Sequence, residues 1–208
     1  FSRVFAARTC MMAGVGLTGV FLWYLVRFWV YGKAVVLTSA PLTIPAGFLI
    51  AGMAVATLIG AALASWAAGP ISERIEEKNI PVARVVAGAC LLYAAGLALA
   101  WGLGVWSTGT ARENGMLLFA LISGFAFGVY DSLGLELVMD SLPDPRRAGH
   151  DLGIYALANS AGLALAAIIG ALLVNAFEHS FGYYLLFPSA IVMVLLAGIV
   201  TLTTKSAE

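Results

Sequence analysis

Charged residues are scarce in this chain. Lys, Arg, Asp and Glu make up 11% of its 208 residues, whereas 62% are apolar. An average soluble domain is about one quarter charged. So few charges cannot cover the surface of a water-soluble fold of this length. The shortage excludes a soluble globular protein and indicates an integral membrane protein.

Cysteine and histidine are also rare, with two of each. Cys10 and Cys90 lie in or beside apolar segments without metal-binding spacing, and His150 and His179 lie at the edges of such segments. These positions favour packed thiols and loop-exposed imidazoles over a metal site. No Gly-rich phosphate loop follows a strand pattern. The sequence therefore predicts no metal, no cofactor and no nucleic-acid partner.

Long apolar runs, in contrast, dominate the sequence. Six of them reach the roughly 20 apolar residues that cross a bilayer. They are continuous and lack the alternation of barrel strands, so they predict helices. We therefore expect an all-α membrane protein, a single six-helix unit over residues 1–208. The helices are expected near residues 9–31, 46–68, 82–105, 116–139, 152–176 and 183–202.

The basic residues are distributed unevenly between the two sides of the predicted bundle. Eight of the eleven lie in the N-terminal flank, in the loops after the second and fourth helices, or at the C-terminus. By the positive-inside rule, this predicts a plasma-membrane protein with both termini in the cytoplasm. The eight are Arg3, Arg8, Arg74, Lys78, Arg84, Arg146, Arg147 and Lys205; the other three are Arg27, Lys33 and Arg112.

A short charged segment, Gly69–Lys78, joins the second and third apolar runs. It resembles the Gly-x-x-Ser-Asp/Glu-Arg-x-Gly-Arg/Lys-Arg/Lys loop between the second and third helices of a major facilitator superfamily half. Glu76 and Glu77 depart from that pattern. The positions that match it are Gly69, Ser72, Glu73, Arg74 and Lys78.

A second segment, Leu142–Gly153, resembles the Leu-Pro-Asp-Pro…Asp-Leu-Gly connection in the C-terminal half of some facilitator transporters, including sugar–cation symporter relatives. Together the two resemblances imply the C-terminal six-helix half of a twelve-helix secondary transporter. Such a protein moves a small solute by alternating access, with H+ or Na+ as a coupling ion. Because the chain begins at Phe1 rather than Met, the N-terminal six-helix half is expected to be missing.

Several charges are candidates for a cytoplasmic gate. Asp151 is expected to cap the fifth helix, whose positive dipole end would attract the carboxylate of Glu73. Arg74 is expected near a carboxylate of the fourth helix or of the loop after it. Glu136 and Asp140, spaced i,i+4, are interpreted as gate or anchoring charges. In the alternative interpretation, Glu73 and Arg74 are solvated anchors that only set the orientation.

Inside the membrane, Asp131 on the fourth helix is the strongest chemical signal. At 100° per residue it projects onto a stripe of small residues formed by Ala120, Gly124 and Gly128. Such a stripe lets another helix approach, so Asp131 is expected to face the interior or a cavity. Two uses remain open: a coupling site for a proton or cation, or a structural partner of a basic residue such as Arg74.

Two further polar residues, Tyr155 and Asn159, share a face of the fifth helix. They are candidates for hydrogen-bonding a polar solute, and the alternative is an interhelical contact in a packing seam. The second helix carries a seam interpreted as packing only: Gly52, Ala56, Gly60 and Ala64. A six-helix scaffold and an intramembrane enzyme remain as alternatives to transport. An aspartyl intramembrane protease, however, would need a second aspartate within another helix.

Overall fold

The structure, a computed structural model, describes residues 1–31, 44–106, 110–140, 148–177 and 179–204. Every element in these ranges is helical, and six spans among them are long and apolar enough to cross a membrane. The prediction of an all-α protein with six such helices is confirmed. The elements are α1 (Ser2–Gly19), α2 (Leu22–Tyr24), the π-helix η1 (Leu25–Val30), α3 (Ile44–Glu77), α4 (Val82–Trp106), α5 (Thr110–Asp140), α6 (Ala148–Ala176) and α7 (His179–Leu202).

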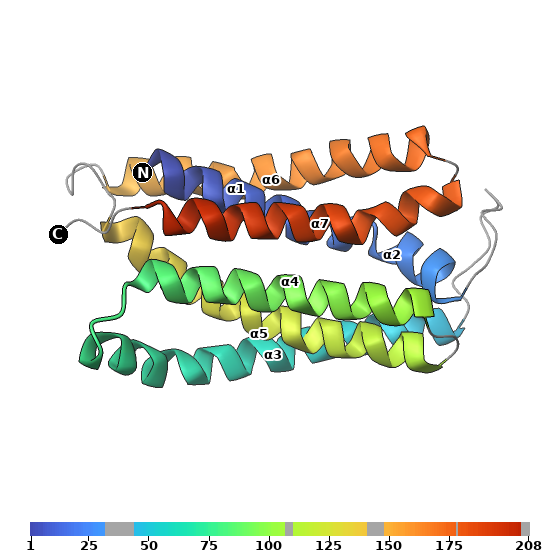
Figure 1. The fold of residues 1–208 in the computed structure, drawn as a ribbon, viewed down its shortest axis with the longest axis horizontal. Coiled ribbons are helices and arrows are strands. Elements are labelled where there is room, and N and C mark those ends of the chain that lie inside the picture. Colours follow the sequence, from blue (N-terminus) through green and yellow to red (C-terminus); the bar gives the residue numbers. More distant parts are fainter. Residues whose placement is uncertain (32–43, 107–109, 141–147, 178, 205–208) are drawn as a thin grey trace.

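The long helices run side by side and form two groups of three (Figure 1). In the α1/α6/α7 group, α1 packs against both α6 and α7. In the α3/α4/α5 group, α3 and α4 both pack against α5, and contact between α4 and α7 joins the two groups. The first helix therefore packs with the last two rather than with its neighbours in sequence. The start of α1 and the end of α7 lie at the same end of the bundle (Figure 1).

The small residues of α3 and α5 bring these two helices into backbone contact. A Cβ atom added to Gly60 would collide with the carbonyl oxygen of Leu121, and one added to Gly124 would collide with the carbonyl of Thr57. In lipid, such close packing holds helices together through dispersion contacts, because lipid tails are as apolar as the side chains. The two seams of small residues therefore pack against each other.

The first apolar run, predicted as one helix, is divided in the structure. α1 ends at Gly19, and Phe21 has φ −97° and ψ 7°, outside regular helical geometry. The short α2 and the π-helix η1 follow. Hydrophobic periodicity does not reveal this break, because the apolar composition continues without interruption through it.

Trp29 anchors η1 to two other helices. The centre of its ring lies 4.2 Å from the ring centre of Tyr184 and 5.5 Å from that of Phe187, both on α7. On its other side the indole lies against the backbone of Gly104 on α4. Arg112 of α5 donates a hydrogen bond of 3.0 Å to the Trp29 carbonyl. These contacts hold the π-helix between the two groups.

Substitution of Gly104 by alanine tests this anchor. The added Cβ would overlap the indole of Trp29, so we expect a loss of about 1–3 kcal/mol in the free energy of unfolding, typical of an overpacked core. Gly88→Ala, on the same helix, is the matched control because its Cβ would meet nothing within 4 Å. Thermal unfolding in mild detergent gives the comparison, and equal midpoints for the two variants would contradict the packing of η1 on α4.

The segment Gly69–Lys78 is mostly helical, so the prediction of a loop there is wrong. α3 continues through Pro70 and ends at Glu77, eight residues beyond Gly69. Its end is a Schellman motif, in which Asn79 has φ 50° and the N–H of Ile80 donates to the carbonyl of Ile75 at 3.0 Å. A proline removes only one backbone hydrogen bond, and the good helix formers after Pro70 let the helix continue.

Candidate functional site

A buried arginine, Arg8, lies at the centre of the polar contacts inside the bundle. It belongs to the first half of α1, where that helix packs between α6 and α7, and 7% of its surface is exposed. A buried charge costs several kcal/mol unless charged and hydrogen-bonding partners surround it. The neighbours of Arg8 therefore decide what this part of the protein can do.

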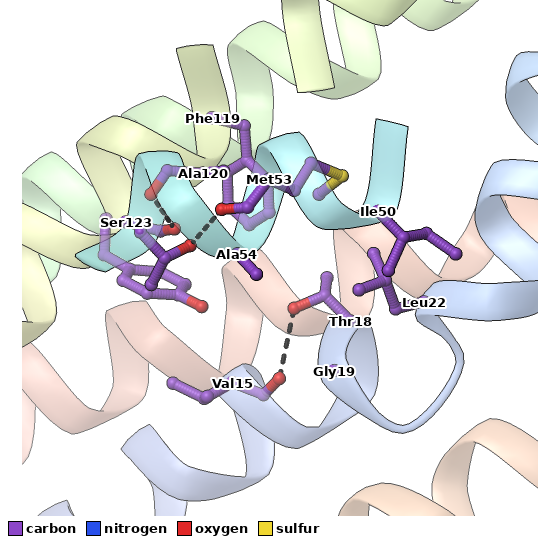
Figure 2. A pocket seen from close by; sticks show the side chains of 12 residues that line it. Val15, Thr18, Gly19, Leu22, Ile50, Met53, Ala54, Phe119, Ala120 and Ser123 are labelled. Carbon is purple, nitrogen blue, oxygen red and sulfur yellow. Dashed lines mark hydrogen bonds between the residues drawn. The ribbon is translucent and has the colours of Figure 1, made fainter. Parts of the chain in front are cut away.

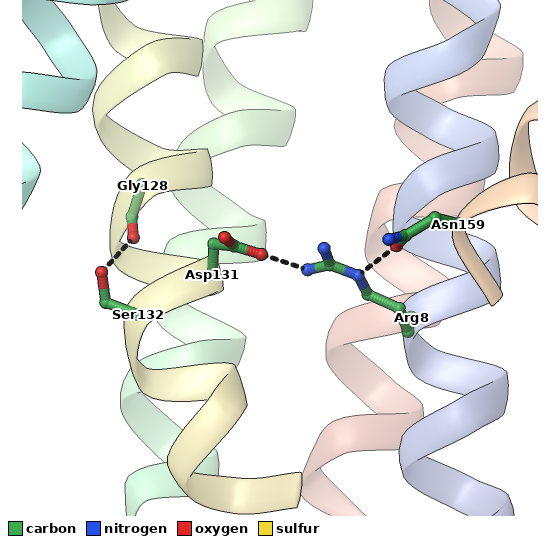
Figure 3. Close-up of polar contacts among 5 residues, drawn as sticks. All are labelled: Arg8, Gly128, Asp131, Ser132 and Asn159. Carbon is green, nitrogen blue, oxygen red and sulfur yellow. Dashed lines mark hydrogen bonds and ion pairs between the residues drawn. The ribbon is translucent and has the colours of Figure 1, made fainter. Parts of the chain in front are cut away.

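Two polar side chains from different helices bind the guanidinium (Figure 3). Arg8 Nη1 lies 2.7 Å from Oδ1 of Asp131 on α5. Arg8 Nε donates a hydrogen bond of 2.7 Å to Oδ1 of Asn159 on α6. The ion pair thus links the α1/α6/α7 group to the α3/α4/α5 group.

Aromatic rings enclose the same guanidinium. Its Cζ atom lies 5.7 Å from the ring centre of Phe127 and 5.6 Å from those of Tyr130 and Tyr155. A cation within about 6 Å of a ring face is attracted to it, most strongly where water is excluded. Arg8 is therefore held by one charge, one amide and three rings from α5 and α6.

The two partners of the ion pair differ in exposure. The side chain of Arg8 is 9% exposed and that of Asp131 is 55% exposed. The carboxylate therefore lies at the surface of the bundle, whereas the guanidinium is enclosed by it. Neutralising Asp131 would leave a buried cation without its counter-charge.

The structure brings together the three intramembrane residues selected from the sequence. Asp131 and Asn159 bind Arg8, and Tyr155 places its ring over it. The suggestion that Arg74 is the basic partner of Asp131 is wrong, because Asp131 pairs with Arg8 on α1. The stripe at Gly124, in contrast, faces α3, the helix that carries Arg74. A helix as long as α5 meets different neighbours along its length, and a single helical projection merges them.

Arg8 itself escapes prediction from the sequence. The apolar run begins at Thr9, which assigns Arg8 to the cytoplasmic flank, but α1 already begins at Ser2. A signal is nevertheless present in the sequence. Val4 and Met11 lie four residues before and three residues after Arg8, on the same helical face, and both are buried.

The predicted gate residues do not form a connected cluster in the described part of the chain. Glu73 and Arg74 lie exposed near the end of α3, and neither side chain forms a hydrogen bond or ion pair with another described residue. Asp151 lies within the first turn of α6 rather than capping it, because α6 begins at Ala148; its Oδ1 is 3.3 Å from Nδ1 of His150.

The remaining gate residues lie at the same end of the bundle. The side chain of Asp140, the last residue of α5, lies outside the described residues, as does the segment 141–147. Glu136 is exposed on α5. The other matched motif positions are Gly69 and Ser72 on α3 and Lys78 just after its end. Ser72 is half-buried, and Gly69 and Lys78 are exposed.

A pocket of about 250 Å³ lies further along the boundary between α1 and the α3/α4/α5 group (Figure 2). Its walls are largely apolar, with hydroxyl groups from Thr18, Thr57, Tyr93 and Ser123, and Arg8 does not line it. Among the described residues, no three His, Cys, Asp or Glu side chains are grouped so that they hold a metal ion.

Comparison with known proteins identifies the family. The sequence model of the Major Facilitator Superfamily matches residues 47–208, well over half of the chain. That match starts within α3, so Arg8 precedes it. No curated protein and no solved structure matches the chain. With its six membrane-spanning helices, the chain belongs to the Major Facilitator Superfamily, whose members carry small solutes across membranes.

Proposed function

We propose that the chain is the C-terminal six-helix half of a secondary transporter that works by alternating access. The exposure of α3 and α6 supports a partner half. Only 22% of the most apolar part of each is buried, against 39–50% in the other four spans. A second six-helix half packed against these two helices would cover them. The solute then moves between the halves.

The observation that carries the proposed mechanism is the ion pair between Arg8 and Asp131. It joins the two helix groups, and its carboxylate is accessible whereas its guanidinium is buried. Binding of H+ or Na+ to Asp131 removes the counter-charge of a buried cation. Breaking a buried pair in this way costs about 3–5 kcal/mol. Since about 1.4 kcal/mol changes a two-state ratio tenfold, this is enough to shift the balance between two arrangements of the groups.

The orientation follows from the basic residues near one end of the bundle. The start of α1 and the end of α7 share that end with the connection from α3 to α4 (Figure 1). Arg8 no longer counts as a flanking charge, but Arg3, Arg74, Lys78 and Arg84 remain. In the proposed topology this end faces the cytoplasm of a cell whose plasma membrane contains the protein. Glu73, Arg74 and Asp151 then act at the cytoplasmic gate.

Substitution of Asp131 by asparagine tests the coupling. The amide oxygen still accepts a hydrogen bond from Arg8 but cannot take up a proton. We therefore expect loss of uptake against a gradient and retention of solute exchange. Proteoliposomes of the full-length transporter containing a trapped pH dye are first screened for solutes that drive proton flux in the unmodified protein. The best solute, in radiolabelled form, is then used to compare the variants.

Glu76→Gln is the control. It removes an acidic side chain that is exposed and without an ion pair among the described residues, at a position that departs from the family motif. Its uptake should equal that of the unmodified protein. Unchanged concentrative uptake in Asp131→Asn would eliminate Asp131 as the coupling residue. Proton-independent but sodium-dependent uptake in the unmodified protein would keep Asp131 as the coupling site and identify Na+ as the ion.

A further inference from the structure

The pocket beside Thr18 is built differently from the Arg8 site. It lies among α1, α3, α4 and α5, one wall comes from the point where α1 ends, and Gly19 and Leu22 line it there (Figure 2). Within a membrane, an interrupted helix is tolerated where its backbone is covered by protein or lines a cavity. The break at Phe21 therefore lies beside this pocket, between two of its lining residues.

Three of the four hydroxyl groups in this pocket present acceptors rather than donors. These three donate their O–H to a backbone carbonyl three or four residues earlier on their own helix, as the dashed lines in Figure 2 show. Their lone pairs remain free to accept. The bonds are Thr18 to Val15 at 3.1 Å, Thr57 to Met53 at 2.9 Å and Ser123 to Ala120 at 3.0 Å.

Tyr93 adds a fourth hydroxyl to the wall. Thr18 and Ser123 are both buried, where moving an O–H away from its acceptor is costly. A ligand that offers O–H donors therefore finds the oxygens of Thr18, Thr57 and Ser123 able to accept without breaking a hydrogen bond within the protein.

The rest of the wall sets the size and polarity of the ligand. No charged side chain lines the pocket, and Phe119, Met53 and Ile50 contribute apolar surface. Its volume of about 250 Å³ is below the roughly 300–1,000 Å³ of sites for drug-sized molecules. An anion would meet lone pairs without a compensating cation or N–H group.

We propose that this pocket binds a small uncharged molecule with an apolar or aromatic body and one to three O–H donors, such as a phenol or an alcohol. Resting on the proposed function, it is the solute site of the transporter and opens toward the partner half along α3, where its lining residues Ala54 and Thr57 are exposed. The ligand body packs against Phe119 and Met53, and its hydroxyl hydrogens bond to Ser123 and Thr57. The site is separate from the ion pair that senses the coupling ion.

Protection of an introduced cysteine measures binding at this pocket directly. Ala54 lines the pocket and is exposed, so Ala54→Cys is alkylated with N-ethylmaleimide in the membrane-embedded full-length protein, and the modified peptide is quantified by mass spectrometry. Phenol, benzyl alcohol and cyclohexanol are the donor probes. At least one should slow alkylation fivefold or more. Anisole, which lacks the donor, and benzoate, which is an anion, should leave it unchanged at equal concentration.

Hydroxyl variants and a distant cysteine complete the test. In the Ala54→Cys background, Thr57→Val and Ser123→Ala should each raise the half-protecting concentration roughly three- to tenfold. Ser132→Ala is the matched control, because the Ser132 hydroxyl also bonds to a carbonyl of its own helix, that of Gly128 at 2.9 Å, but does not line the pocket. A cysteine at the exposed Ser65 of α3 should show no protection, which excludes a general effect of the probes on the bilayer.

Each outcome has a defined meaning. Equal protection by anisole or stronger protection by benzoate would contradict the requirement for an uncharged ligand with an O–H donor. Protection by none of the three donor probes would contradict ligand binding in this pocket. Because alkylation needs no transport, the proposed function fails separately: protection without probe-driven flux would keep the pocket and reject its role as the solute site.

Discussion

Replacement of Gly124 by valine is expected to prevent stable folding of the bundle. The first added carbon would collide with the backbone carbonyl of Thr57, and on the opposite helix Gly60 contacts the backbone at Leu121 in the same way. A backbone cannot rotate away as a side chain can, so α3 and α5 must separate. Overpacking of a core costs about 1–3 kcal/mol. A loss beyond that range is expected here, because the contacts along the whole seam weaken together.

Gly134→Val is the control for this variant. It places the same β-branched residue in the same helix, but a Cβ at Gly134 would meet nothing within 4 Å. Size-exclusion profiles and thermal midpoints in mild detergent give the comparison. We expect an aggregated or very unstable Gly124→Val protein beside a monodisperse Gly134→Val protein. Midpoints within a few degrees of each other would rule out backbone contact between α3 and α5.

Removal of Asp131 should destabilise the protein more than removal of Arg8. Asp131→Ala leaves the guanidinium of a 9% exposed arginine without its counter-charge, which costs about 3–5 kcal/mol. Arg8→Met removes the buried charge and leaves a carboxylate that is already 55% exposed. The double variant Arg8→Met/Asp131→Ala should therefore regain most of the stability that Asp131→Ala loses, while remaining inactive in coupled transport.

Thermal unfolding of the two single variants and of the double variant measures this coupling. Glu136→Ala removes another carboxylate from α5 and should change the midpoint little, since Glu136 is exposed and unpaired among the described residues. Additive losses in the double variant would show that Arg8 and Asp131 contribute independently. That result would remove the physical basis for Asp131 as a switch.

Much of the fold is predictable because the bilayer imposes simple requirements. Run length and composition indicate six helices, and small residues every four positions indicate a packing stripe on α3 and another on α5; the structure shows that the two stripes meet. Asp131, Tyr155 and Asn159 stand out because polar groups are costly in lipid, and the structure brings all three to one arginine. Their roles in coupling and solute binding stay predictions.

Other features depend on contacts that a sequence pattern does not contain. The break at Phe21 falls within a continuous apolar run, and the π-helix after it is held through Trp29 by α4 and α7, far away in sequence. The partner of Asp131 depends on α1 lying opposite α5, which only the three-dimensional arrangement provides. The helical Gly69–Lys78 segment shows that a family motif identifies residues more reliably than their local conformation.

The pairing of the first helix with the last two has a consequence for biosynthesis. Arg8 is made about 120 residues before Asp131, roughly 6–25 s earlier at 5–20 residues per second. During that interval the nascent first helix carries an arginine without its carboxylate. Because Arg8 lies only two turns from the start of α1, its side chain can extend to the lipid headgroups. The charge is drawn into the bundle only after α5 and α6, which carry its partners, have been made. Closure around Arg8 is therefore a late step of assembly.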